Sequence, residues 1–261
     1  MHTMLVTGFG LWEGVTYNPT GLVARELDGQ TITGAGSPVS AKIVGRVLDV
    51  AWADGSDAVT INSGASVTGA ARALAQAVND VKPDLLLSFG VIPSGMNQFD
   101  VEPEADDRNR LDARDVRGQV AARAREHETF PQTLALAFPA KAIMNALKKE
   151  GLDAVSSPGL GNYLCERIAY EGAWLAKYGP HRMRMSGFIH VPNPMVQATG
   201  SSASTLSSLD ASQKQALATG YAQVLRGAKL AVETCLAHLQ DDRLRTPAWR
   251  DGPRPKGSLL V

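Results

Sequence analysis

Short, mostly apolar runs alternate with helical patterns along this chain, and this alternation constrains the fold more than any other feature. Residues 4–9 and 85–89 read as buried strands. Between them, a helix predicted over residues 67–81 carries Ala, Leu and Val on one face. Strand, helix and strand in succession favour a parallel sheet that helices cover on both faces. The sequence therefore predicts an α/β fold, a three-layer α/β/α sandwich with a mostly parallel twisted sheet, in a single domain.

The remaining segments extend this pattern. Further strands are predicted over residues 41–50, 134–138, 153–157 and 182–190, and further helices over 19–27, 139–149, 164–178 and 210–239, the last as one long helix or a helix pair. Residues 198–208 are rich in Ser, Thr and Gly and are predicted to form a mobile loop. Residues 102–130 are dense in charged side chains, which indicates a mostly solvated surface. We expect one domain over residues 1–241 and an irregular tail over 242–261.

Composition narrows the possible functions. Among 261 residues, 26 Lys and Arg balance 26 Asp and Glu, so the formal charge is zero and nucleic acid is not an expected partner. No apolar run is long enough to span a membrane, and no signal peptide is visible. Two cysteines are too few for a disulfide framework, so a reducing cytoplasm is the expected location. The five histidines show no ligand spacing, and neither a metal nor a cofactor is expected.

Cys165 occupies the position in this sequence that most favours a reactive thiol. Pro158, Gly159 and Gly161 mark a turn, and Asn162 can cap the helix that follows. Cys165 then falls in the first helical turn, where unpaired amides and the helix dipole favour a thiolate over a thiol. The sequence therefore predicts a charged, nucleophilic sulfur at this helix start.

A base for this thiol is expected at His190, which ends the strand predicted over 182–190. In open α/β sheets, reactive groups gather at the carboxyl ends of the strands, so His190 and Cys165 can share one crevice. Either residue alone is more often structural, but a single intracellular Cys with a distant His is a known nucleophile signature. Cys235 lies on the apolar face of the last predicted helix, where a core role is expected.

Several motifs carry a resemblance to a known family. They are Phe188-Ile189-His190-Val191-Pro192, Gly161-Asn162-Tyr163-Leu164-Cys165, Thr7-Gly8-Phe9 with Trp12 and Asn18-Pro19, and Ala140-Lys141-Ala142-Ile143. With them, the sequence resembles the pyrrolidone carboxyl peptidase family, also called pyroglutamyl peptidase I, of intracellular cysteine peptidases. The resemblance extends to about residue 240. It implies removal of an N-terminal pyroglutamyl residue through an acyl-enzyme.

The resemblance also implies a Glu–Cys–His triad of Glu102, Cys165 and His190, with Glu104 as the other candidate for the carboxylate. It places the substrate, a small peptide or lactam, among Phe9, Trp12, Asn18, Val91 and Leu164. It further implies a homodimer or homotetramer.

One loop departs from the family pattern. Where the family has Gly-Gln-Ala-Gly-Gly-Arg, this chain has Gly90-Val91-Ile92-Pro93-Ser94-Gly95-Met96. The family's Gln is expected near the lactam, and Val91 cannot replace an amide that both donates and accepts. Two alternatives therefore stay open: a related cysteine hydrolase for another small lactam, cyclic imide or N-acyl amide, and a non-catalytic homologue that binds a ligand in the same crevice.

Overall fold

The computed structural model describes residues 1–52, 59–60, 66–67, 69–92, 97–156, 161, 163–181 and 183–240. The predicted tail over residues 242–261 lies outside the described residues. Pro158, Gly159 and Asn162, and residues 93–96 of the divergent loop, also lie outside them.

A seven-stranded sheet forms the centre of the molecule, in the order β10-β7-β11-β6-β1-β3-β2. Its members are β1 (His2–Phe9), β2 (Thr31–Thr33), β3 (Ser40–Leu48), β6 (Leu85–Val91), β7 (Phe99–Val101), β10 (Ala154–Val155) and β11 (Met185–Val191). The four central strands β3, β1, β6 and β11 are parallel, while β2 and β7 run antiparallel to β3 and β11. The predicted, mostly parallel sheet is confirmed.

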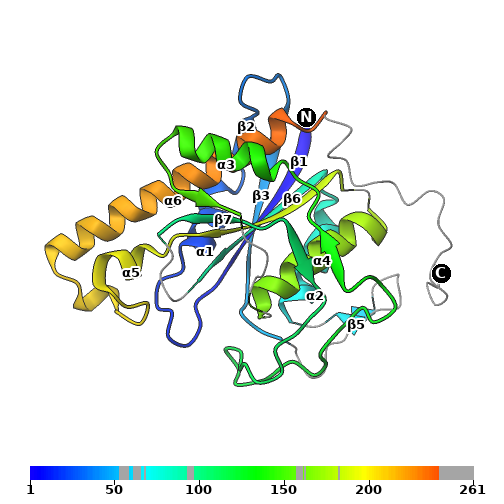
Figure 1. The fold of residues 1–261 in the computed structure, drawn as a ribbon, viewed down its shortest axis with the longest axis horizontal. Helices are drawn as coiled ribbons and strands as arrows, with labels where there is room; N and C mark the ends of the chain where they lie inside the picture. The colour runs from blue at the N-terminus through cyan, green and yellow to red at the C-terminus, as the bar shows by residue number, and fades with distance from the viewer. Residues whose placement is uncertain are drawn as a thin grey trace.

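Helices cover both faces of this sheet (Figure 1). The helices are α1 (Pro19–Leu27), α2 (Ala70–Val81), α3 (Ala140–Lys149), α4 (Leu164–Tyr178), α5 (Pro194–Thr199) and α6 (Ala211–Ala237). In Figure 1, α1, α3 and α6 lie on one side of the sheet, and α2 and α4 lie together on the other. This is the three-layer α/β/α sandwich that the alternating pattern predicts.

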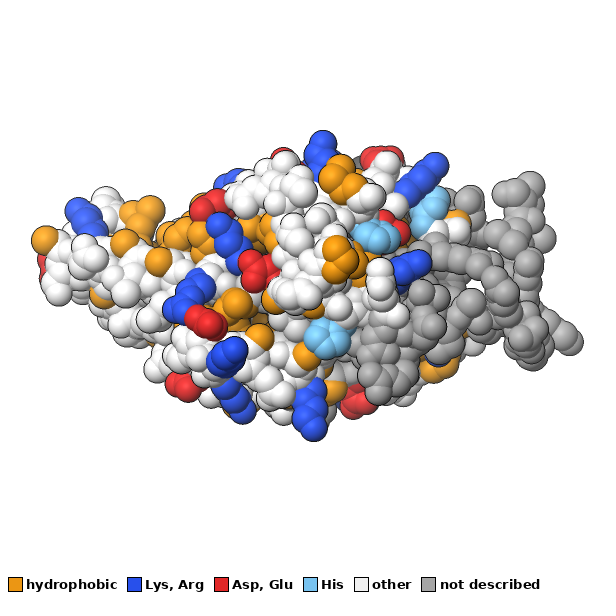
Figure 2. Space-filling view, turned by 90° about the horizontal axis from the view of Figure 1, so that it is seen from above, with side chains coloured by type: hydrophobic (Ala, Val, Ile, Leu, Met, Phe, Trp, Pro, Cys, Tyr) orange, Lys and Arg blue, Asp and Glu red, His pale blue; other side chains and the backbone are white. Residues whose placement is uncertain are grey.

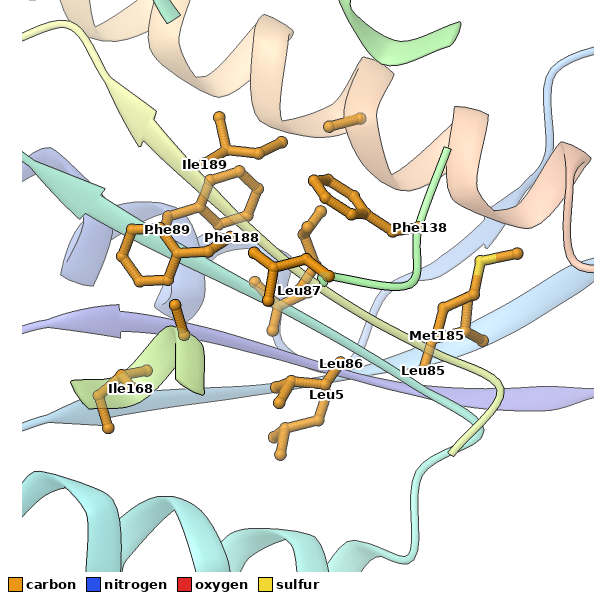
Figure 3. Packing of buried hydrophobic residues seen from close by; sticks show 14 of the residues in the cluster. Leu5, Leu85, Leu86, Leu87, Phe89, Phe138, Ile168, Met185, Phe188 and Ile189 are labelled. Atoms are coloured by element: carbon orange, nitrogen blue, oxygen red, sulfur yellow. The ribbon is translucent and has the colours of Figure 1, made fainter. Parts of the chain in front are cut away.

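The core lies where the central strands meet these helices. Residues 85–89 and 185–189 are fully buried because their strands are covered on both faces. Figure 3 shows their side chains packed with Phe138 on the side of α6 and with Ile168 of α4 on the other. Burial of this apolar surface fixes the register in which β6 pairs with β11. In that register, the carboxyl ends of both strands lie at the same edge of the sheet.

Two of the predicted segments differ from the structure, and a third, the last predicted helix, takes one of its two predicted forms. Only Thr133–Ala135 of the strand predicted over 134–138 is extended, and this strand, β9, pairs with β8 (Glu104–Asp106) in a separate two-stranded sheet. Residues 198–208 are not a free loop, because Ser202 accepts from Thr16 N and donates its hydroxyl to the Gly14 carbonyl at 2.7 Å. A short 3₁₀ helix, Leu206–Ser208, follows within that segment. The last predicted helix is one continuous helix, α6.

The segment 102–130 is mostly exposed, as its charge indicates, but several of its polar side chains are buried. Asp107, Asn109, Asp115 and His127 are all at most 5% exposed. Helix α4 supplies partners for two of them: Arg167 donates to Asp107 at 3.0 Å, and His127 lies 2.8 Å from Glu171. Asn109 instead donates to the Arg123 carbonyl at 3.0 Å, and Asp115 accepts from Trp52 N at 2.8 Å. Buried charges need such partners. The segment is therefore attached to the body of the protein through α4.

A smaller pair of strands, Val59–Thr60 and Ser66–Val67, lies apart from the main sheet.

On the face shown in Figure 2, Lys and Arg side chains are interspersed with Asp and Glu side chains. None of the helices among the described residues is both long and apolar enough to cross a membrane.

Candidate functional site

Cys165 is the second residue of α4, and its sulfur lies against the end of β6. A Cβ atom added to Gly90 would lie 2.9 Å from the sulfur and 2.7 Å from Phe188 Cζ. Only glycine leaves room for the sulfur here, since a methyl group at that distance would collide with it. Gly90 pairs with His190 across β6 and β11, so the sulfur stands beside the sheet position that carries the imidazole.

His190 and Glu102 form a buried pair next to this sulfur. Nδ1 of His190 lies 2.8 Å from Oε1 of Glu102, and both residues are at most 2% exposed. The bond orients the ring and leaves its other nitrogen, Nε2, for a second partner. Glu104, the other candidate for the carboxylate, is exposed and belongs to β8. The structure therefore brings Glu102, and not Glu104, to the histidine.

Burial governs the protonation of this site. It raises the pKa of the Cys165 thiol to about 12, and the charges of Glu102 and Glu166 add to that effect. It also lowers the pKa of His190 to about 4. Burial therefore opposes the expected resting thiolate, since loss of water around the sulfur raises the thiol pKa while the backbone hydrogen bond at the helix start lowers it. At both groups, burial favours the neutral form.

A cavity of about 610 Å³ opens over the sulfur and the imidazole. Four of the five residues expected to bind substrate line it, namely Phe9, Trp12, Val91 and Leu164. Phe9 and Val91 come from the carboxyl ends of β1 and β6, and His190 comes from the end of β11. The predicted gathering of reactive groups at this edge of the sheet is therefore present.

Asn18 differs from the other four. Its side chain accepts from Thr20 N at 3.1 Å as the N-cap of α1 and donates to the Gly10 carbonyl at 2.8 Å. It is 4% exposed and does not appear among the described residues that line the cavity. Capping is a frequent role of Asn before a proline-initiated helix, and Asn18-Pro19 fits it.

Another part of the cavity wall is not predicted by the sequence. It includes Arg110, Ala113, Arg114 and Asp115 of the segment 102–130, together with Tyr163. The Tyr163 hydroxyl donates to the Arg114 carbonyl at 2.8 Å, which ties this wall to the residue before α4. Asp115 stabilises the turn that carries the wall by accepting from three backbone amides, those of Trp52, Arg117 and Gln119. No periodicity or motif marks the four residues of the segment 102–130, so only the fold reveals them.

The arrangement suits nucleophilic chemistry. A sulfur, an imidazole and a carboxylate come together beneath one cavity. Groups arranged in this sequence can carry a proton away from an attacking thiol. Among the described residues, no group of three or more His, Cys, Asp or Glu is placed to hold a metal ion.

Comparison with known proteins agrees with this geometry. The family model described as pyroglutamyl peptidase matches residues 2–234. The pyrrolidone-carboxylate peptidase of Pyrococcus furiosus is 30% identical over 72% of this chain and 80% of its own. That of Klebsiella pneumoniae is 29% identical over 87% of this chain and 94% of its own.

Solved structures give the same result for the fold. A mutant pyrrolidone carboxyl peptidase from Pyrococcus furiosus superposes with a TM-score of 0.70 at 26% identity, covering 91% of this chain and 99% of that one. Since the family model extends over most of the sequence and the solved fold over nearly all of it, the chain belongs to the pyroglutamyl peptidase family.

Proposed function

We propose that this member of the family is a cysteine peptidase that removes an N-terminal pyroglutamyl residue from peptides, with Glu102, Cys165 and His190 as its catalytic triad. The observation that carries the proposal is the buried bond between His190 Nδ1 and Glu102 Oε1, beneath a cavity that the Cys165 sulfur also lines. A carboxylate bonded to the histidine at this distance selects the tautomer whose Nε2 can accept a proton.

In the first half of the reaction, the sulfur of Cys165 attacks the carbonyl carbon of the pyroglutamyl group. The thiol proton passes to Nε2 of His190, and the carbonyl oxygen takes the negative charge of the tetrahedral intermediate. The intermediate then collapses, the C–N bond breaks, and His190 returns the proton to the departing amine. A thioester between Cys165 and the acyl group remains.

In the second half, water replaces the amine. His190 takes a proton from the water as it attacks the thioester, and the C–S bond then breaks. The same proton returns to the sulfur, so pyroglutamate leaves and the neutral thiol is restored. Glu102 stabilises the imidazolium in both halves because its carboxylate accepts the Nδ1 proton.

Backbone amides are the proposed donors for the oxyanion. The N–H of Cys165 lies at the start of α4, where helix amides have no intrahelical partner. A second donor is proposed in the loop over residues 90–95. Each such donor typically contributes about 2.7–4 kcal/mol to the stability of the transition state.

The pyroglutamyl ring is flat and small, and it is proposed to lie between Phe9 and Trp12. Phe9 is 3% exposed, so it forms the floor of the cavity, while the half-buried Trp12 can cover the ring from the solvent side. Aromatic faces of this kind provide apolar contact for a planar ligand.

Hydrolysis of a pyroglutamyl anilide tests this function. The wild-type protein is expected to release the aniline, and Cys165→Ala should lower the rate by roughly 10⁴-fold or more. Cys235→Ala is the matched control, because that thiol is buried in α6 and should not affect turnover. Equal rates for wild type and Cys165→Ala would refute the nucleophile.

A second candidate function follows from Val91 and Ile92. Both line the cavity, and none of the described cavity residues carries a side-chain amide that could pair with a lactam. A site without that partner discriminates less well between polar and apolar acyl groups. The candidate is therefore a related cysteine hydrolase for another small lactam, cyclic imide or N-acyl amide. A panel of anilides with such acyl groups, run beside the pyroglutamyl compound, separates the two.

We further propose that the chain acts in the cytoplasm as a homodimer or homotetramer. The two free cysteines support a reducing compartment, because the proposed nucleophile must stay reduced. Light scattering on the purified protein measures the assembly directly, and a monomer at all concentrations would contradict that part of the proposal.

A further inference from the structure

Strand β7 brings a second carboxyl group to the proposed triad. Asp100 pairs directly with His190 across the antiparallel β7–β11 contact, and directly opposed residues project from the same face of a sheet. Glu102 is two residues further along the chain, so its side chain projects from that same face. His190 is therefore faced by two acids from one segment. Asp100 is only 4% exposed, so water screens its charge weakly.

We propose that Asp100 is a positioning residue for the reaction, which sets the pH range of catalysis by holding a second negative charge beside the Glu102–His190 pair. The inference rests on the proposed triad, through which Asp100 would act. The proposed role requires no contact between Asp100 and the substrate. Asp100 is not one of the described residues that line the cavity.

The effect of Asp100 on Glu102 has a clear direction. Burial, followed by the charge of Asp100, raises the pKa of Glu102 to about 8. Oε2 of Glu102 is buried and has no hydrogen-bond partner among the described residues, which further favours a bound proton. Two carboxylates close together in a buried site do not both ionise readily, so one of them holds its proton to higher pH.

The extra proton matters because it opposes catalysis. A protonated Glu102 donates its hydrogen to Nδ1, which leaves the hydrogen of the neutral ring on Nε2, where the thiol proton must arrive. The Glu102–His190 pair must first release this proton to the solvent. Glu102 can then accept from Nδ1–H, and His190 can take the proton of Cys165. The reactive form therefore lies on the alkaline side of the transition.

Other charged groups also lie around His190, and a substitution of Asp100 leaves them unchanged. Burial lowers the pKa of His190, and the charge of Asp100, followed by that of Glu166, opposes this effect. Glu166 lies next to Cys165 on α4, and its Oε1 accepts from Asp106 N at 2.5 Å. The cavity is also lined by the charged residues Glu13, Arg110, Arg114 and Asp115. None of these groups belongs to β7, so a change confined to Asp100 leaves all of them in place.

The test compares Asp100→Asn, which keeps the shape and removes the charge, with wild type across the pH range in which both are folded. The measurement is kcat/KM for the pyroglutamyl anilide against pH. We expect the acid limb of the Asn variant to move to lower pH by about one unit, the usual scale of such shifts. Asp100→Glu keeps the charge and should leave the limb near its original position. A merely structural role would lower the rate at every pH without moving the limb.

A second readout keeps the inference separate from the proposed substrate. The rate at which iodoacetamide alkylates Cys165, followed by peptide mapping, reports thiolate formation without any hydrolysis, and its acid limb should move in the same direction. Asp100→Ser serves if the Asn variant does not fold. If wild type fails to cleave the anilide but the alkylation limb moves, the proposed function fails and the role of Asp100 stands. The proposed role of Asp100 would be overturned if the acid limb of the neutral variants stayed in place or moved to higher pH. An equal shift in Asp100→Glu would also overturn it.

Discussion

The backbone of Gly90 lies directly against the sulfur of Cys165, so that a Cβ atom at Gly90 would stand 2.9 Å from Sγ. This contact joins the end of β6 to the start of α4. It places the sulfur next to the strand position that pairs with His190. The close approach of the Gly90 backbone therefore fixes the position of the thiol before any substrate binds.

Gly90→Ala is expected to displace the sulfur and to lower kcat. The added methyl group would collide with both Sγ and Phe188 Cζ, and displacement of a reacting atom by about 1 Å can cost on the order of 10²-fold in rate. Gly34→Ala is the matched control, since its Cβ would lie 2.6 Å from Ala237 N, at the end of α6. Both variants should lose thermal stability, but only Gly90→Ala should lose activity in its folded form. Similar kcat values for the two would contradict this account.

Glu102→Gln should reduce kcat strongly while the protein stays folded. A neutral amide cannot stabilise the imidazolium, and loss of such a carboxylate costs about 10⁴-fold in the serine-protease example of the same arrangement. Glu104→Gln tests the alternative carboxylate, because Glu104 is exposed and two residues away. Steady-state kinetics on the anilide should show normal turnover for the Glu104 variant. The reverse ranking would assign the third group of the triad to Glu104.

The wild-type rate should rise with pH through about 8. Below the pKa of Glu102, which burial and Asp100 raise to about 8, the Glu102–His190 pair holds an additional proton and the base is blocked. Above it, the proton is lost and His190 can accept from Cys165. A kcat/KM profile measured with a neutral substrate should therefore have its acid limb near this value. A limb near the ordinary range of a free glutamate, about 4, would show that the burial of Glu102 does not control the reaction.

Arg167→Met should destabilise the fold by about 3–5 kcal/mol, the usual cost of leaving buried charges without their partner. Arg167 is 4% exposed and forms ion pairs with both Asp107 and Glu171. Without it, Asp107 would keep Arg125 and Glu171 would keep His127, but both would lose their buried arginine. Arg226→Met is the control, because the Arg226–Glu150 ion pair is exposed and such pairs contribute about 0–1 kcal/mol. Urea unfolding of both variants gives the comparison. A loss below 1 kcal/mol for Arg167→Met would mean that the segment 102–130 is held by other contacts.

The sheet and the pair Cys165 and His190 could be predicted because both depend on local patterns. The apolar runs at residues 4–9 and 85–89 are short and end at glycine, which favours buried strands. A strand end followed by a helix start then places reactive groups at one edge of the sheet. Glu102 was found by resemblance to a family, and the bond to His190 explains that position physically.

What the sequence could not predict depends on long-range contacts. The charges of residues 102–130 look solvated until α4 provides Arg167 and Glu171 as partners, and those partners lie about 40 or more positions away. The burial that opposes a thiolate at Cys165 has a similar origin, since it depends on how closely the backbone of Gly90 approaches the sulfur. Asn18 has the residue type of a ligand-binding group, but it serves as a helix cap.

Trapping of the acyl-enzyme tests the central claim most directly. A pyroglutamyl aryl ester acylates a thiol quickly, so hydrolysis of the thioester becomes the slow step and the intermediate accumulates. The protein is mixed with the ester, quenched in acid, digested and mapped by mass spectrometry. The account predicts one pyroglutamyl group, on the peptide that contains Cys165. Continued turnover with Cys165 unmodified, or with the group on another residue, would contradict it.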